Sequence, residues 1–271
     1  MSLSFPQVLY KYRSVNELSL HALASGSVWY PKPGALNDPN DVAARWDKNF
    51  TAKEILEDYV MKRESGSPVN GIASYVQNLL DKGQSHEAVL KHIDKLFMPV
   101  DKKTQRELLQ DLLYYNEVMF SDFGVLSLSE SPDNHLMWAH YADSHKGFCL
   151  GFENHETNII GQYGHPVDYV EKMPKPTIQS FAMDAGGEVI HLVAYTKSRD
   201  WAYEKEWRVL KQEGNRLYPY PGRLVEVILG VNMAAEAEVK IREAVLKSEY
   251  RPIFKRIKKK ENAFDLSLED C

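Results

Sequence analysis

Short stretches with the two-residue period of a β-strand recur along the chain. Residues 8–14 (VLYKYRS) and 124–130 (GVLSLSE) alternate apolar and polar positions, and residues 27–31 and 148–153 are shorter strand candidates. Residues 224–230 (LVEVILG) form an apolar run that is typical of a buried strand. Three further strands are expected over residues 167–170, 252–259 and 264–269.

Helical signals fall between these strands. Asn16 is a suitable N-cap for a short helix, and Asp133 is a suitable N-cap for a helix over residues 134–145. Residues 190–201 are expected to form a helix that leads into a later strand. Residues 234–247 carry the charge and apolar spacing of an amphipathic helix.

A longer helical block lies between the first and second groups of strands. Thr51 and Glu54 form a capping-box pattern, and helical spacing continues over residues 72–80, 88–97 and about 101–119. Because strand-like segments flank this block, we expect a helical insertion over about residues 51–120. The sequence therefore predicts an α+β fold with a small β core, formed by one composite domain over residues 1–271.

Composition and charge limit the functions that the chain can have. The 271 residues are 44% hydrophobic and 26% charged, which is typical of a globular protein. A formal net charge of -5 is not the footprint of non-specific nucleic-acid binding. Two cysteines make no disulfide framework, and we expect Cys149 to be a buried thiol. With no signal-peptide or membrane-span pattern, the expected location is cytoplasmic, without membrane partners.

Two glutamates stand close together in residues 202–212 (AYEKEWRVLKQ). A strand over this segment places Glu204, Glu206 and Arg208 on one face, with Trp207 and Val209 on the other. Two carboxylates on one strand face repel each other unless a cation, a ligand or water separates them. The segment is therefore either a working site or a solvated surface beside a buried core strand.

Metal-binding patterns are weak. His140 and His145 flank Asp143, but no further ligands follow at the spacing of a known metal motif, so we expect no metal site there. Asp38 and Asp41 lie in a turn-rich loop without the glycine and distal glutamate of a calcium loop, and are second-rank site candidates.

Several motifs resemble those of a widespread bacterial family that is a domain of unknown function. They are LYKYRS, the NDPND loop, VLSLSESPDNHLMWAHYADSHKGFCLGFE, and the run from Lys197 through Trp201 and Tyr203 to Glu204, Glu206, Trp207 and Arg208. The resemblance covers most of the chain between Leu9 and Arg208. It names relatives without implying a chemistry.

A second, looser resemblance is to the ADP-ribosyltransferase superfamily. Its small split β core carries three motif strands: Arg, His or Tyr on the first, Ser or Tyr on the second, and Glu-x-Glu or Gln-x-Glu opening the third. The same order occurs here in residues 10–13 (YKYR), in Ser127-Leu128-Ser129 and in Glu204-Lys205-Glu206. The resemblance implies an NAD-dependent transferase or glycohydrolase, which would serve as a bacterial toxin or as a phage-defence effector.

That resemblance also implies roles for individual residues. Glu206 would stabilise the positive charge that develops on the ribose, Glu204 would orient it or the acceptor, and Arg208 would fix the pair. NAD would be a substrate, and the acceptor would be water, a protein or a nucleic acid. The residues implied in nucleotide binding are Tyr10, Lys11, Tyr12, Arg13, Ser127, Ser129, Tyr141 and Arg208.

Two other classes of function remain open. One is a metal-assisted phosphodiesterase in which Asp38, Asp41, Glu204 and Glu206 hold a divalent ion beside Lys197. The other is a non-catalytic binding or scaffold domain. In that case the two glutamates form ion pairs with Lys197 and Arg208, and Trp207 belongs to the core.

Overall fold

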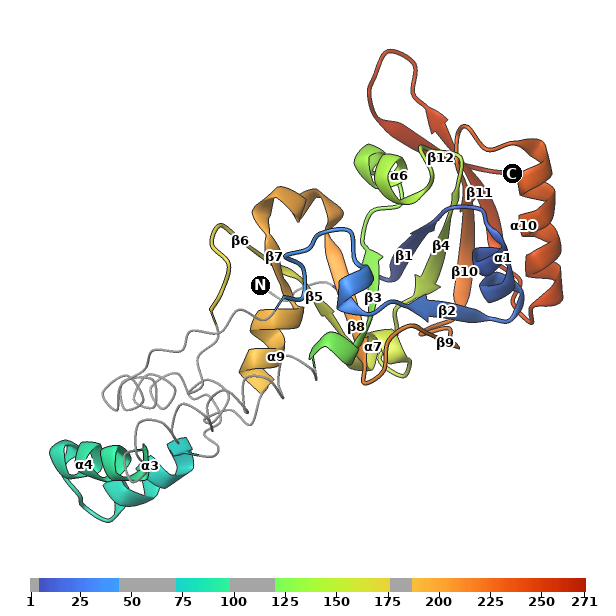
Figure 1. Cartoon of the computed structure of the whole chain (residues 1–271). Coiled ribbons are helices and arrows are strands. Elements are labelled where there is room, and N and C mark those ends of the chain that lie inside the picture. Colours follow the sequence, from blue (N-terminus) through green and yellow to red (C-terminus); the bar gives the residue numbers. More distant parts are fainter. Residues whose placement is uncertain (1–4, 44–71, 98–119, 176–186) are drawn as a thin grey trace. The chain divides into compact units, whose positions relative to one another are not determined.

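The computed structural model describes residues 5–43, 72–97, 120–175 and 187–271 (Figure 1). They fall into two compact units. The first consists of Met1–Leu36, Asp122–Glu171 and Lys197–Cys271, and the second of Asn37–Ser121 and Lys172–Thr196. The expected helices near residues 51–60 and 101–119 lie outside the described residues, and the single composite domain stays a prediction.

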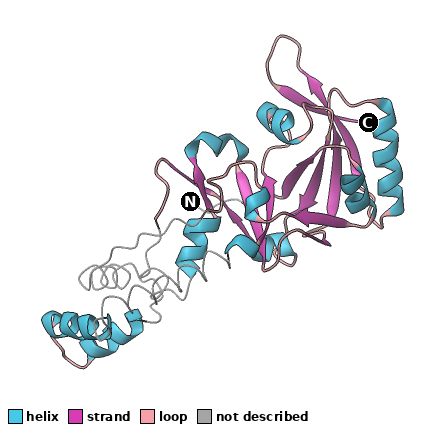
Figure 2. Ribbon diagram, viewed as in Figure 1, coloured by secondary structure: helices cyan, strands magenta, loops and turns pink. Residues whose placement is uncertain are grey.

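The first unit is built on an eight-stranded mixed sheet (Figure 2). Neighbouring strands are antiparallel except β10 and β11, which are parallel. Across the sheet the strands are β12 (Leu266–Asp270), β11 (Ile253–Lys259), β10 (Leu224–Leu229), β4 (Phe148–Glu153), β1 (Val8–Arg13), β3 (Gly124–Ser129), β8 (Glu206–Lys211) and β5 (Gly164–Pro166).

Short elements complete this unit. Two strand pairs lie outside the large sheet: β2 (Ser27–Tyr30) with β9 (Arg216–Pro219), and β6 (Asp168–Val170) with β7 (Thr196–Ser198). The helices are α1 (Glu17–Ala24), α6 (His135–Tyr141), α7 (Ile159–Tyr163) and α10 (Ala235–Lys247), with 3-10 turns η1 (Pro33–Ala35) and η2 (Arg199–Glu204).

Helices cover both faces of the sheet because its strands alternate their buried side chains. On one face, Leu23 of α1 and Ile241 of α10 pack with Leu9, and α1 lies beside α10 (Figure 1). On the other face, Trp138 of α6 packs with Tyr12 and is almost perpendicular to its ring. The sheet is therefore the middle of three layers.

The second unit contributes α3 (Ile72–Asp81), α4 (His86–Phe97) and α9 (Gly187–Ala194). Gly83 has a φ of 78°, a left-handed conformation that glycine adopts without strain and that commonly ends a helix. Val76 and Val89 are fully buried. Among the described residues of both units, no helix is long and apolar enough to cross a lipid bilayer.

The α+β fold class is confirmed, and so is the Asn16 cap, whose side chain accepts from Ser19 N. The proposed Asp133 cap is wrong. Asn134 caps α6 by accepting from the main-chain N–H groups of Leu136 and Met137. The helix then ends at Tyr141 instead of running to residue 145, because Asp143, Ser144 and His145 all take positive φ values.

The expected helix over residues 190–201 is also wrong in part. The chain is helical only to Ala194, forms strand β7 at Thr196–Ser198, and then turns into η2. The Ser198 side chain accepts from Asp200 N and so caps this 3-10 turn. Local polar bonding at Ser198 thus interrupts the helical pattern.

Candidate functional site

Glu204 and Glu206 belong to different elements. Glu204 is the last residue of η2, Lys205 takes a left-handed φ of 44°, and Glu206 begins β8. The prediction that both glutamates alternate along one strand is therefore wrong for Glu204. It holds for Glu206 and Arg208, and Trp207 and Val209 lie in the core as expected.

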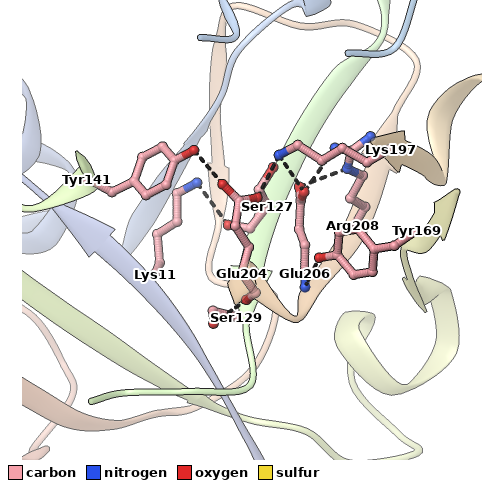
Figure 3. A network of polar contacts seen from close by, with 9 residues as sticks. All are labelled: Lys11, Ser127, Ser129, Tyr141, Tyr169, Lys197, Glu204, Glu206 and Arg208. Atoms are coloured by element: carbon pink, nitrogen blue, oxygen red, sulfur yellow. Dashed lines mark hydrogen bonds and ion pairs between the residues drawn. The ribbon is translucent and has the colours of Figure 1, made fainter. Parts of the chain in front are cut away.

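The ammonium of Lys197 forms ion pairs with both carboxylates. Lys197 Nζ lies 2.6 Å from Oε2 of Glu204 and 3.1 Å from Oε2 of Glu206 (Figure 3). All three side chains are about 4% exposed, so water screens these charges little. The repulsion between the two glutamates is thus balanced inside the protein, by a residue of β7.

A second cation holds Glu206 in a bidentate pair. Nε of Arg208 donates to Oε1 at 2.8 Å, and Nη2 donates to Oε2 at 3.0 Å. The Arg208 side chain has no exposed surface. Two parallel charge-assisted bonds fix the plane of the carboxylate as well as its position. The main-chain N–H of Glu206 in turn donates to the Tyr169 hydroxyl at 2.8 Å.

Glu204 is held by hydroxyl groups from two other elements. The Tyr141 hydroxyl donates to Oε1 at 2.6 Å, and the Ser129 hydroxyl donates to the main-chain oxygen at 2.6 Å. We call Tyr141, Lys197, Glu204, Glu206 and Arg208 the carboxylate network (Figure 3). Its members come from α6, β7, η2 and β8.

The pKa values of the two carboxylates are shifted in opposite directions. Burial raises the pKa of Glu204 above its ordinary value, and this outweighs the lowering by Lys197. Burial also acts to raise the pKa of Glu206, but Arg208 and Lys197 outweigh it and bring that pKa well below the ordinary value. Glu206 is therefore firmly ionised at neutral pH, while Glu204 takes up a proton more readily.

The first strand reaches the network through Lys11. Its Nζ donates to the main-chain oxygen of Ser127 at 2.9 Å (Figure 3). The Ser127 side chain is hydrogen-bonded to Glu206. Burial, with the positive charge of Arg13, lowers the pKa of Lys11 to about 7 against the attraction of Glu206 and Glu204.

The other candidates on this strand have different partners. Tyr10 donates to Glu226 at 3.3 Å, and Tyr12 donates to the main-chain oxygen of Ser131 at 2.5 Å. The half-buried Arg13 lies near Tyr220, and burial lowers its pKa. Of the four candidates on β1, Lys11 is thus the one that is connected to the carboxylate network, through its hydrogen bond to Ser127.

The described residues contain no group of three or more His, Cys, Asp or Glu side chains that could hold a metal ion. Asp38 and Asp41 belong to the second unit, whereas both glutamates belong to the first. The carboxylate oxygens of Glu204 and Glu206 already accept from Tyr141, Lys197 and Arg208. The described residues therefore give the phosphodiesterase alternative no metal site.

Two residues of the site were not anticipated. Tyr169 binds the main-chain N–H of Glu206, and Asn134 Nδ2 donates to the main-chain oxygen of Tyr203 at 2.8 Å. Tyr169 carries no signal in the sequence, because a lone tyrosine in a three-residue strand matches no motif. Asn134 could have been identified from the sequence, because asparagine is a preferred N-cap residue and a helical pattern follows it.

Fold and site together define an α+β protein with a mixed sheet and a buried, charge-balanced network at one end of it. Residues 137–209 match a family model described as "Protein of unknown function (DUF2971)". This segment runs from α6 to β8 and contains every member of the carboxylate network. Comparisons with curated proteins and with solved structures gave no match.

Proposed function

We propose that the carboxylate network is the active site of an enzyme that cleaves the nicotinamide–ribose bond of NAD, as an ADP-ribosyltransferase or an NAD glycohydrolase. One observation carries the proposal: two buried carboxylates share the Lys197 ammonium, and their pKa values shift in opposite directions. Such divided acidity is the arrangement that acid–base chemistry requires.

The proposed reaction uses this division. The C–N bond to nicotinamide breaks, and its electron pair leaves with the nicotinamide, so that positive charge develops on the ribose. Glu206 remains ionised and stabilises that charge by Coulomb attraction. Water, or a nucleophile of a protein or nucleic-acid acceptor, then adds to the ribose carbon. Glu204, with its raised pKa, accepts the proton that this nucleophile releases.

Aromatic rings near Glu204 support the binding of a planar group. The exposed His140 ring lies 6.2 Å from the Tyr141 ring and 6.3 Å from the Tyr203 ring. Half-buried aromatic rings beside a charged site provide surfaces on which nicotinamide could stack. In this proposal Arg13 carries most of the positive charge that the diphosphate requires, the Lys11 amine adds a hydrogen-bond donor, and Ser127 positions the ribose.

The non-catalytic scaffold remains the second candidate because of one specific observation. Arg208 donates to both oxygens of Glu206, so that this carboxylate is already neutralised in the structure. A network of this kind also joins α6, β7, η2 and β8 without any ligand. The two candidates predict different results when the glutamates are replaced.

The deciding experiment is incubation of the purified chain with NAD, followed by chromatography of free nicotinamide. We expect release by the wild type, and a loss of at least about 100-fold in Glu204→Gln and Glu206→Gln. The matched control is Glu171→Gln, which removes an exposed carboxylate from its 2.7 Å pair with Arg199 and should leave the release unchanged.

Circular dichroism must show that all three variants are folded. Absence of nicotinamide release, with and without added nucleic acid or protein extract, would overturn the enzymatic proposal in favour of the scaffold. A positive result would fit a bacterial, cytoplasmic toxin or phage-defence effector that depletes NAD or modifies a macromolecule.

A further inference from the structure

Two lysines approach the carboxylate network, and their surroundings are different. Lys197 Nζ lies within 3.1 Å of an oxygen of each glutamate. Lys11 Nζ has a single hydrogen-bond partner among the described residues, the main-chain oxygen of Ser127 at 2.9 Å, and no ion pair there. One lysine is therefore fully compensated and the other is not.

This difference decides which form of each lysine the protein stabilises. An ammonium has three N–H donors, and one carbonyl satisfies only one of them. A neutral amine needs only that one bond and keeps its lone pair free. Since Lys11 is half-buried, water can accept from the two remaining N–H donors of the ammonium only in part.

The titratable groups around Lys11 come from four elements. Arg13 on the same strand repels the ammonium, while Glu206 of β8 and Glu204 of η2 attract it. Burial raises the pKa of the Cys149 thiol of β4, which therefore stays neutral near pH 7. Burial is the largest influence, and with Arg13 it lowers the pKa of Lys11 to about 7 against the attraction of the two glutamates. About half of the Lys11 side chains are then neutral at pH 7, against about 1 in 2,500 for an ordinary lysine.

We propose that Lys11 is a nucleophilic amine that forms an imine with the carbonyl carbon of a small, aldehyde-bearing ligand. Lys11 belongs to β1, which pairs with β3 at Tyr10 and Ser129 only. The Lys11 amine points toward the side chain of Glu204 (Figure 3). This inference does not depend on NAD cleavage.

The reaction is balanced without an oxidant or a reductant. The lone pair of Nζ attacks the carbonyl carbon, and the carbonyl electron pair moves to oxygen to give a carbinolamine. Glu204, whose burial favours the protonated form, supplies the proton with which the hydroxyl leaves as water. It regains a proton from nitrogen as the C=N bond forms. The products are the imine and one water molecule.

The test uses the full chain, glycolaldehyde as the probe and cyanoborohydride to trap the imine as a stable secondary amine. Peptide mass spectrometry then gives the modification rate of every lysine in one sample. Lys240 and Lys247, exposed on α10, are the internal controls. Because all lysines share the same reagents, the ratio of rates removes the pH dependence of the reduction.

We expect Lys11 to react at least about tenfold faster than Lys240 and Lys247 at pH 7. That advantage should shrink toward pH 10, where ordinary lysines also become neutral. Glu204→Gln should slow the labelling of Lys11 and leave the control lysines unchanged. In Lys11→Met, the fast-reacting peptide should disappear.

Formaldehyde, a smaller aldehyde, is run in parallel to separate access from reactivity. If Lys11 reacts no faster than the control lysines with either aldehyde between pH 6 and 8, the proposal is wrong. This outcome would leave the NAD proposal untouched, since no nucleotide takes part in the labelling.

Discussion

The Tyr141 hydroxyl donates a 2.6 Å hydrogen bond to Oε1 of Glu204, which lies 63 positions later in the chain. Asn134, at the other end of α6, donates to the main-chain oxygen of Tyr203. Two polar contacts therefore fix α6 against η2. Because Tyr141 is only half-buried, it connects the surface of the protein to a buried carboxylate.

Tyr141→Phe removes one of the two donors to the Glu204 carboxylate. We expect a loss of about 1.5–3 kcal/mol in the free energy of unfolding at pH 7, because a buried charged acceptor is left less satisfied. Urea denaturation measures this loss. Tyr163→Phe, on a 56% exposed ring, is the matched control and should change little. Equal losses in the free energy of unfolding for Tyr141→Phe and Tyr163→Phe would show that the hydrogen bond from Tyr141 to Glu204 does not stabilise the protein.

Lys197→Met removes the ammonium that Glu204 and Glu206 share. Breaking a buried pair on one side leaves an uncompensated charge, so we expect a loss of about 3–5 kcal/mol. Adding Glu204→Gln removes one of the two charges and should restore part of that loss. A double-mutant cycle from urea denaturation would show a coupling of about 0.5–3 kcal/mol. Strictly additive losses would mean that the two side chains do not interact.

The Glu206 carboxylate should make stability depend on pH in acid. Its folded pKa is lowered below the unfolded value of about 4.3, so its contribution is complete above that pH and is lost as the pH falls through the folded pKa. Against Glu206→Gln, the wild type should be more stable at pH 7, with a difference that shrinks below pH 4.3. Urea denaturation at several pH values tests this. A stability difference between the wild type and Glu206→Gln that grows in acid would show that the folded pKa of Glu206 is not lowered.

Trp207→Ala tests the core beneath the site. Trp207 is 6% exposed, packs in the large core cluster, and donates from Nε1 to Glu130 at 2.8 Å. We expect a loss of about 3–5 kcal/mol, which a thermal melt would detect. Leu246→Ala, on a 68% exposed residue of α10, should stay within about 0.5 kcal/mol. A melt of Trp207→Ala that matches this control would show that Trp207 contributes nothing to the core.

Gly147→Ala tests the close approach of the turn after α6 to β1. A Cβ at position 147 would lie 2.1 Å from the main-chain oxygen of Arg13, and backbone cannot move aside cheaply. We expect a loss of about 1–3 kcal/mol in the free energy of unfolding. Gly34→Ala meets nothing within 4 Å and is the control. If Gly147→Ala and Gly34→Ala have the same melting temperature, the close approach of residue 147 to Arg13 does not limit the side chain at position 147.

Local patterns in the sequence were sufficient for most strands and for several helix boundaries. Alternation identified Val8–Arg13 and Gly124–Ser129, and the apolar run identified Leu224–Leu229. These predictions succeed because a strand with one buried face must repeat every two residues, wherever the sheet places it. The four-residue strand Arg216–Pro219 went unnoticed, although its equally short partner Ser27–Tyr30 was predicted.

Local patterns failed where one residue changes the direction of the chain. Nothing in the residues around Lys205 distinguishes a left-handed turn from a continuing strand, because only glycine and asparagine commonly favour that conformation. Asp133 and Asn134 are both good N-cap residues, and the neighbouring Tyr203 carbonyl engages Asn134. In both places, contacts between distant segments override the local preference.

The sequence by itself determined the alternation of buried positions, the α+β class and the presence of two acids beside a buried Trp207, because these follow from local spacing and residue type. Only the tertiary structure decided that Lys197 serves both glutamates while Lys11 meets a single carbonyl. The order and register of β1, β3 and β8 bring together residues 11, 127 and 206, and Lys197 comes from β7, which pairs with β6 outside that sheet. No local pattern encodes that register, since it depends on the packing of the whole sheet.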